Sequence, residues 1–138
     1  MHRSGFTFGK NEKLCSRKII DQLFLKGETF LAYPLRIRFL PTELPGDVPV
    51  QVMFQVSKKR FKQAVKRNLL KRRMRESYRL NKPCFIRVFQ ERNLQIAVAF
   101  LYISEKELDY HTIEKGMKKA LLQLIEKTEG YGNTSQNI

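Results

Sequence analysis

Residue types that build catalytic and metal sites are nearly absent from the sequence. The 138 residues include no tryptophan, two cysteines and two histidines. Cys15 and Cys84 belong to no CxxC motif, so we interpret them as free or buried thiols rather than as disulfide or metal-binding residues. His2 and His111 match no catalytic motif, and the phosphate-binding loop, the dinucleotide fingerprint and HExxH are missing too. We therefore expect no catalytic residue and no metal ligand within the protein.

Long apolar runs are also absent. No run approaches the roughly 20 residues that span a bilayer, and the first residues, MHRSGFTFGKNEK, lack the apolar core of a signal peptide. We expect a cytoplasmic protein with no membrane partner. The length and the 42% of hydrophobic residues suit one domain with a modest core. We predict a flexible arm over 1–11, a single domain over 12–127 and a disordered tail over 128–138.

Acidic residues are scarce: 13 of them face 27 lysines and arginines, which gives a net charge of +14. Most of the excess lies in residues 57–79, SKKRFKQAVKRNLLKRRMRESYR, which contain eleven basic residues and one glutamate. Good helix formers without glycine or proline predict a helix over 62–79. At 100° per residue, one arc of roughly 140° on this helix holds Ala64, Arg67, Asn68, Lys71, Arg72, Arg75 and Arg79.

This cationic arc indicates a partner of opposite charge. Like charges four residues apart repel, at a cost of a few tenths of a kcal/mol per pair in an isolated helix. We expect Val65 and Leu69 on one side, and Leu70 and Met74 on the other, to anchor the helix. A solvated helix face is the alternative, although solubility is usually served by mixed signs. An almost purely cationic face is typical of a polyanion binder, so nucleic acid is the expected partner, ahead of an anionic membrane surface.

Hydrophobic spacing predicts two further helices. One covers 12–26, with Asn11 as its N-cap, and the other covers 105–127. Pro83 should break or kink the basic helix, because proline lacks the backbone donor and restricts the residue before it. The residues that follow, 84–93, fit either more helical turns or a strand.

Strand patterns occur on both sides of the basic helix. Alternation predicts half-buried strands over 33–40 and 50–56, and the apolar run 94–104 predicts a central strand that is buried on both faces. The pattern indicates an α+β fold, or α/β sandwich, with helices packed on a sheet of three or four strands. The predicted order is helix, strand, strand, an optional further strand, helix, strand, helix.

The basic segment also resembles a known family signature. It reads Val56-Ser57-Lys58-Lys59, then Ala64-Val65-Lys66-Arg67-Asn68-Leu69-Leu70-Lys71-Arg72, then Arg75-Glu76. This combination directly after a strand resembles the bacterial ribonuclease P protein subunit. The chain departs from the family pattern at Lys62, where a glycine is usual shortly before Ala-Val, and at Ile20, where an aromatic residue often precedes Phe24.

The resemblance implies the fold of the second domain of ribosomal protein S5, with a left-handed crossover around the basic helix against the usual right-handed rule. It implies that residues 12–127 form an RNA-binding domain. The protein would be a monomer in a 1:1 complex with ribonuclease P RNA, in an endoribonuclease that removes the 5′ leader from precursor tRNA. In that family the RNA is the catalyst and binds most of the Mg²⁺, and the protein itself holds no cofactor.

The resemblance also assigns two groups of contact residues. The catalytic RNA would be bound by Lys66, Arg67, Asn68, Lys71, Arg72 and Arg75. The single-stranded leader would enter a cleft between the first helix and the sheet, and the candidates there are Phe24, Tyr33, Arg36, Arg38, Lys58 and Lys59. For Tyr33 and the two arginines, packing or simple solvation remains an open alternative, because the strand register is ambiguous.

Three other functions explain the sequence less well than the ribonuclease P role. A ribosomal or other structural RNA-binding protein would share the charge but would not depend on a leader. A DNA-binding regulator is disfavoured because no short turn joins two helices ahead of the basic helix. A protein-only nuclease is disfavoured because the sequence has no carboxylate cluster.

Overall fold

The computed structural model describes residues 8–131. A short 3-10 turn is followed by three helices and four strands in the predicted order, with the optional strand present. The elements are η2 (Lys10–Glu12), α1 (Arg17–Lys26), β1 (Glu28–Ala32), β2 (Leu35–Pro41), β3 (Val50–Val56), α2 (Ala64–Arg92), β4 (Ile96–Tyr102) and α3 (Tyr110–Lys127). None of the helices in these described residues is long and apolar enough to cross a membrane.

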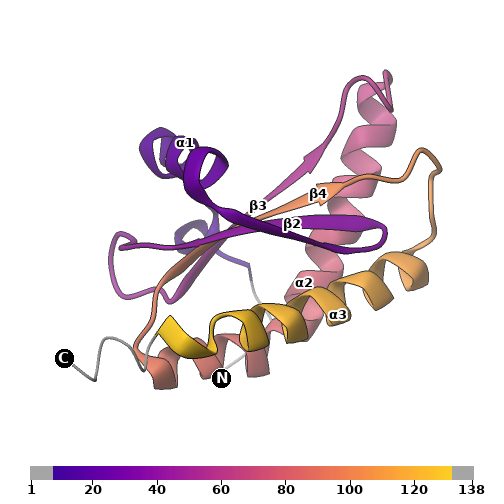
Figure 1. The fold of residues 1–138 in the computed structure, drawn as a ribbon. Coiled ribbons are helices and arrows are strands. Elements are labelled where there is room, and N and C mark those ends of the chain that lie inside the picture. Colours follow the sequence, from indigo (N-terminus) through magenta and orange to yellow (C-terminus); the bar gives the residue numbers. More distant parts are fainter. Residues whose placement is uncertain (1–7, 132–138) are drawn as a thin grey trace.

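The four strands form one sheet in the order β1-β2-β4-β3. β1, β2 and β4 pair antiparallel, whereas β3 runs parallel to β4 and is joined to it through α2. The hand of this crossover stays a prediction. α2 and α3 pack side by side on one face of the sheet and α1 lies on the other (Figure 1).

β4 confirms the prediction of a central strand that is buried on both faces. Ile96, Val98 and Phe100 point into the large core beneath α2 and α3, and all three are fully buried. Ala97 and Ala99 point the other way, toward α1. The two small side chains let α1 approach the sheet closely, and this sets where the end of α1 lies.

Two helices begin later than the sequence predicted. α1 begins at Arg17, because Ser16 is its N-cap and accepts a hydrogen bond from the Ile19 amide at 3.3 Å, so the prediction of Asn11 as N-cap is wrong. α3 begins at Tyr110, where the Asp109 carboxylate accepts from the Thr112 amide at 2.9 Å. The earlier residues of both predicted helices matched the helical period but lie outside α1 and α3 in the structure.

Pro83 does not end the basic helix, which continues to Arg92 and settles the open assignment of 84–93. The helix continues past Pro83 because aromatic side chains beyond the proline are buried against the core. Phe85 and Phe89 are buried with ring centroids 5.0 Å apart, and a break at Pro83 would expose them. The helix ends where Asn93 adopts a left-handed conformation, with φ of 56°.

The predicted strand over 33–40 is one arm of a hairpin. β2 covers Leu35–Pro41, and β1 pairs with it from Glu28 to Ala32, immediately after Gly27. Leu35, Ile37 and Phe39 are fully buried, as the alternation indicates. β1 thus supplies the fourth strand that the sequence pattern left optional.

The first and last residues that the structure describes contact the rest of the domain. Phe8 packs edge-to-face on Phe54 and Tyr78, at centroid distances of 5.9 and 6.0 Å. The Tyr131 hydroxyl donates to a carboxylate oxygen of Glu28 at 2.6 Å, and Thr128 is buried. The predicted arm and tail otherwise fall on 1–7 and 132–138, which lie outside the described residues.

The N-terminal segment is attached to the body through a partly buried ion pair. Lys82 is 3% exposed, pairs with the Glu12 carboxylate and lies near the rings of Phe8 and Tyr78. Burial raises the pKa of Tyr78 far above its usual range, so this phenol stays neutral. Next to the pair, the Leu14 amide donates to the Val52 carbonyl at 2.9 Å, which places this segment along the outer edge of β3.

We predict that Glu12→Gln destabilises the protein by about 3 kcal/mol, because it removes the carboxylate charge that pairs with the buried Lys82 ammonium. The double variant Glu12→Gln/Lys82→Met should regain most of this loss, since no buried charge remains. Urea unfolding followed by circular dichroism measures both values. A loss below about 1 kcal/mol for the single variant would contradict this account of the pair.

We also predict that Gly116→Ala destabilises the protein by about 1 to 3 kcal/mol through overpacking. A Cβ at Gly116 would lie 2.7 Å from the Tyr33 carbonyl oxygen and 2.8 Å from Cδ of Pro34, where α3 packs against the β1–β2 turn. Gly130→Ala is the matched control, because a Cβ there meets nothing within 4 Å. Equal unfolding midpoints for the two variants would show that the close packing is not needed.

Candidate nucleic-acid interface

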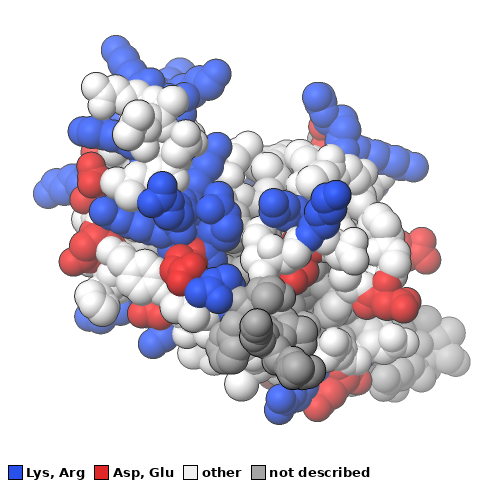
Figure 2. Space-filling view, turned by 180° about the vertical axis from the view of Figure 1, so that it is seen from behind, with Lys and Arg blue, Asp and Glu red and all other residues white. Residues whose placement is uncertain are grey.

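The basic residues of α2 form an exposed surface at its N-terminal end. Leu70 and Met74 are fully buried and anchor the helix as predicted. The prediction for Val65 is wrong, because this side chain is 78% exposed and lies among the cations. Figure 2 shows lysines and arginines gathered over the end of the molecule where α2 begins. In Figure 1 that end of α2 extends past the ends of β3 and β4.

A groove of about 640 Å³ lies between this end of the helix and the sheet. Arg67, Asn68 and Lys71 line it from α2, and Arg36 and Lys58 line it from the sheet side. Three residues predicted to bind the catalytic RNA therefore share one groove with two residues predicted to bind the leader. Its remaining walls include apolar side chains from the ends of β3 and β4, and the lining contains no carboxylate.

Arg60 also lines this groove, although it was not among the predicted contact residues. Its Nη1 donates to the Ile103 carbonyl at 2.5 Å, so it joins the loop before α2 to the end of β4. The only signal in the sequence is its place in the Lys58-Lys59-Arg60 run. Lys59 is exposed in the same loop but does not line the groove.

Arg67 has a structural role in addition to its charge. Its Nη1 donates to the carbonyls of Phe61 and Lys62, at 2.9 Å each, and the side chain is partly buried. These charge-assisted bonds hold the loop that leads into α2. No acidic residue lies in the first turn of the helix, and the N-cap Gln63 makes no side-chain hydrogen bond. The positive end of the helix dipole therefore adds to the cationic potential of the groove.

The outer part of the arc is exposed. Lys66, Asn68, Arg72 and Arg75 all face solvent. Within the described part of the chain, the ion pairs of α2 join Arg73 to Glu107, Arg79 to Glu76 and Lys82 to Glu12. Lys66, Arg72 and Arg75 form none of them, so these three charges are available to a partner.

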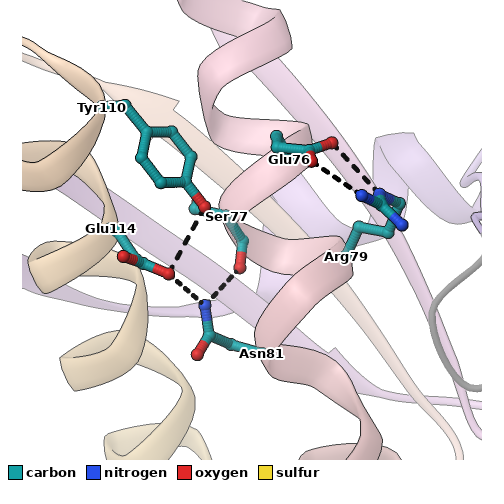
Figure 3. Close-up of polar contacts among 6 residues, drawn as sticks. All are labelled: Glu76, Ser77, Arg79, Asn81, Tyr110 and Glu114. Atoms are coloured by element: carbon teal, nitrogen blue, oxygen red, sulfur yellow. Dashed lines mark hydrogen bonds and ion pairs between the residues drawn. The ribbon is translucent and has the colours of Figure 1, made fainter.

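Arg79 marks the far end of this cationic surface. Its guanidinium donates to both carboxylate oxygens of Glu76, at 3.1 and 2.7 Å (Figure 3). The hydrogen bond from Arg79 lowers the pKa of Glu76 below its usual value, so the pair stays ionised. The unbalanced charge of the arc therefore ends at Arg75.

A polar network one turn further on fixes α2 against α3. The Glu114 carboxylate accepts from Asn81 Nδ2 at 3.0 Å and from the Tyr110 hydroxyl at 3.3 Å, and Asn81 also donates to the Ser77 carbonyl (Figure 3). Burial, followed by the charge of Glu114, raises the pKa of Tyr110 to about 12, so the phenol remains a donor. This contact between the helices holds the cationic surface in a fixed orientation.

The other leader candidates lie in two further places. Phe24, near the end of α1, meets Arg38 of β2: Nη2 of Arg38 lies 2.8 Å from the Phe24 carbonyl oxygen, and its guanidinium carbon is 5.6 Å from the ring centroid. Tyr33 lies at the β1–β2 turn, is 62% exposed and donates its hydroxyl to Ser104 Oγ at 3.0 Å. These residues flank the sheet and do not line the groove.

The described residues, 8–131, contain few potential metal ligands that lie close together. In that range no three histidine, cysteine, aspartate or glutamate side chains come together in a way that would hold a metal ion. Cys15 and Cys84 are free and exposed.

Known proteins resemble this chain in sequence and in fold. The Ribonuclease P family model matches residues 8–125. A protein named Ribonuclease P protein component from Porphyromonas gingivalis is 39% identical over 120 residues, which cover 86% of this chain and 88% of that protein.

Solved structures are similar in fold. The RNase P protein from Thermotoga maritima superposes with a TM-score of 0.62 at 21% identity, covering 80% of this chain and 94% of that chain. A Staphylococcus aureus RNase P protein gives a TM-score of 0.60 at 18% identity, covering 83% and 95%. The family match and the identity over most of both chains show that this chain belongs to the Ribonuclease P family of protein components.

Proposed function

We propose that this protein is the RNA-binding subunit of a ribonuclease P holoenzyme and promotes removal of the 5′ leader from precursor tRNA. The single observation that carries the proposal is the groove at the start of α2, which is cationic and has no carboxylate in its lining. Family membership gives this surface its expected partner, since the relatives are named as ribonuclease P protein components. The protein acts as a monomer with one RNA, in the cytoplasm.

The protein contributes electrostatics and positioning rather than bond cleavage. The catalytic RNA and the precursor tRNA are both polyanions, and their approach is opposed by repulsion between phosphates. Lys66, Arg72 and Arg75 dock on folded RNA, which presents a dense phosphate surface. The groove and the sheet side receive the single-stranded leader, whose bases are unstacked and whose phosphates are accessible.

In this proposal the RNA, not the protein, binds Mg²⁺. Protein sites for Mg²⁺ use carboxylate oxygens, whereas the groove offers lysine, arginine and asparagine side chains and backbone. These residues do not fit the ion, and we derive no step through it on the protein. The protein lowers the Mg²⁺ concentration that the holoenzyme needs, because its own cations replace part of the counter-charge.

We predict that adding the protein to a catalytic ribonuclease P RNA at low Mg²⁺ restores cleavage of precursor tRNA. Gel analysis of the 5′ end of the product measures it. The affinity of the complex for precursor tRNA should exceed its affinity for mature tRNA, since only the precursor carries a leader. Equal affinities and no restored cleavage would leave a structural RNA-binding protein as the function.

We predict that Arg72→Ala weakens binding to the catalytic RNA about fivefold and lowers the slope of log affinity against log salt by roughly 0.7 to 0.9, the value for one phosphate contact. Filter binding at several salt concentrations gives both numbers. Lys118→Ala on the exposed face of α3 is the matched control, because it removes one charge away from the groove. An equal loss for both variants would mean that net charge alone is responsible.

Arg67→Ala should behave differently from Arg72→Ala. It removes the hydrogen bonds to Phe61 and Lys62 as well as a charge, so it should lower the free energy of unfolding by about 1.5 to 3 kcal/mol. Urea unfolding of the two variants distinguishes these roles. Unchanged stability in Arg67→Ala would show that the loop does not depend on this side chain.

A further inference from the structure

Two arginines on β2 have the same orientation but different surroundings. Arg36 and Arg38 lie opposite Leu101 and Ala99 of β4, on the sheet face that also carries α1. Arg36 is exposed and lines the groove. Arg38 is partly buried, and its Nε is buried with no hydrogen-bond partner among the described residues. The alternation of side chains along β2 would by itself assign both arginines the same role.

The guanidinium of Arg38 is directed at the end of α1. The last four carbonyls of a helix lack partners within the helix. The Phe24 carbonyl is one of these four, and it accepts from Nη2 of Arg38 at 2.8 Å. A cation at a helix C-terminus is also favoured by the helix dipole. Arg38 therefore satisfies a backbone group and anchors α1 to β2.

The C-terminal end of α1 packs closely against the backbone of β2. A Cβ at Gly27 would lie 2.4 Å from the Leu23 carbonyl oxygen and 3.0 Å from the Phe39 carbonyl oxygen. α1 therefore ends directly on the backbone of β2, one residue along from Arg38. The Phe24 ring is held between this fixed backbone, the small core around Leu23 and the guanidinium 5.6 Å from its centroid. The ring remains partly exposed.

Phe24 is one of the leader contacts that the family resemblance implies. We propose that Arg38 is a positioning residue that acts through Phe24, because it fixes the ring where an unpaired base of single-stranded RNA can stack on it. This assignment rests on the proposed function and replaces the expectation that Arg38 contacts the RNA itself. One of its nitrogens is bonded to a carbonyl and another is buried, so it is poorly placed to reach a phosphate. Arg36, two residues earlier, is the phosphate contact.

A fluorescence experiment tests this directly, because the chain contains no tryptophan. In the full-length Phe24→Trp variant, the new indole is the sole tryptophan. A ten-nucleotide oligoadenylate should quench it, and an abasic oligonucleotide of equal length should not, because it carries the phosphates without the bases. Quenching by both oligonucleotides, or by neither, overturns the stacking platform.

A double-mutant cycle separates positioning from direct contact. Arg38→Met should weaken oligoadenylate binding about tenfold and leave the salt slope unchanged, whereas Arg36→Met should lower that slope by roughly 0.7. In a Phe24→Ala background, Arg38→Met should cause no further loss, because there is no ring to position. Arg38→Lys should recover part of the affinity. An additive loss in the cycle, or a reduced salt slope in Arg38→Met, overturns the inference.

The cycle also distinguishes this inference from the proposed function. A wild-type protein that restores precursor cleavage but gives additive losses in the cycle refutes the role of Arg38 alone. A wild-type protein that fails to restore cleavage refutes the proposed function, whatever the cycle gives. Circular dichroism melts of each variant exclude misfolding, and in Arg38→Met a melt that coincides with wild type makes the loss of affinity specific to the ring.

Discussion

The whole arrangement depends on the packing of one side of α2 against the sheet. The helix carries like charges on its outer side, and each repelling pair costs only a few tenths of a kcal/mol. On the inner side, Leu70, Met74 and Phe89 are fully buried, and each such side chain contributes about 1.5 to 3 kcal/mol. Burial therefore outweighs repulsion by a wide margin. The protein can keep a concentrated positive charge on a rigid helix before any partner is bound.

The start of α2 and the ends of β3 and β4 meet at one corner of the molecule. This explains why residues predicted to bind the catalytic RNA and residues predicted to bind the leader line the same groove. Parallel pairing of β3 with β4 places their carboxyl ends together, and α2 follows β3 after a short loop. Arg36 reaches the same corner because β2 pairs with β4 on its other side. Contacts with folded and single-stranded RNA would thus be continuous across the groove.

Sequence patterns predicted the features that depend on local periodicity. The strand over 50–56 and the cationic arc follow from side-chain spacings of two and 3.6 residues, and the buried central strand follows from its continuous apolar run. The extension of α2 past Pro83 did not, because the burial of Phe85 and Phe89 is a tertiary effect that overrides the local signal. The pairing of Arg38 with Phe24 also escaped prediction, since it joins residues on separate elements whose approach only the fold defines.

β3 is an outer strand of the sheet, and such a strand offers unpaired backbone groups to any other extended chain. The segment around Lys13 and Leu14 lies along it, and the Glu12–Lys82 pair holds that segment in place. The segment thus covers part of an edge to which another extended chain could otherwise add. One carboxylate near the N-terminus, paired with a lysine in the middle of the chain, therefore helps to keep the outer edge of the sheet covered.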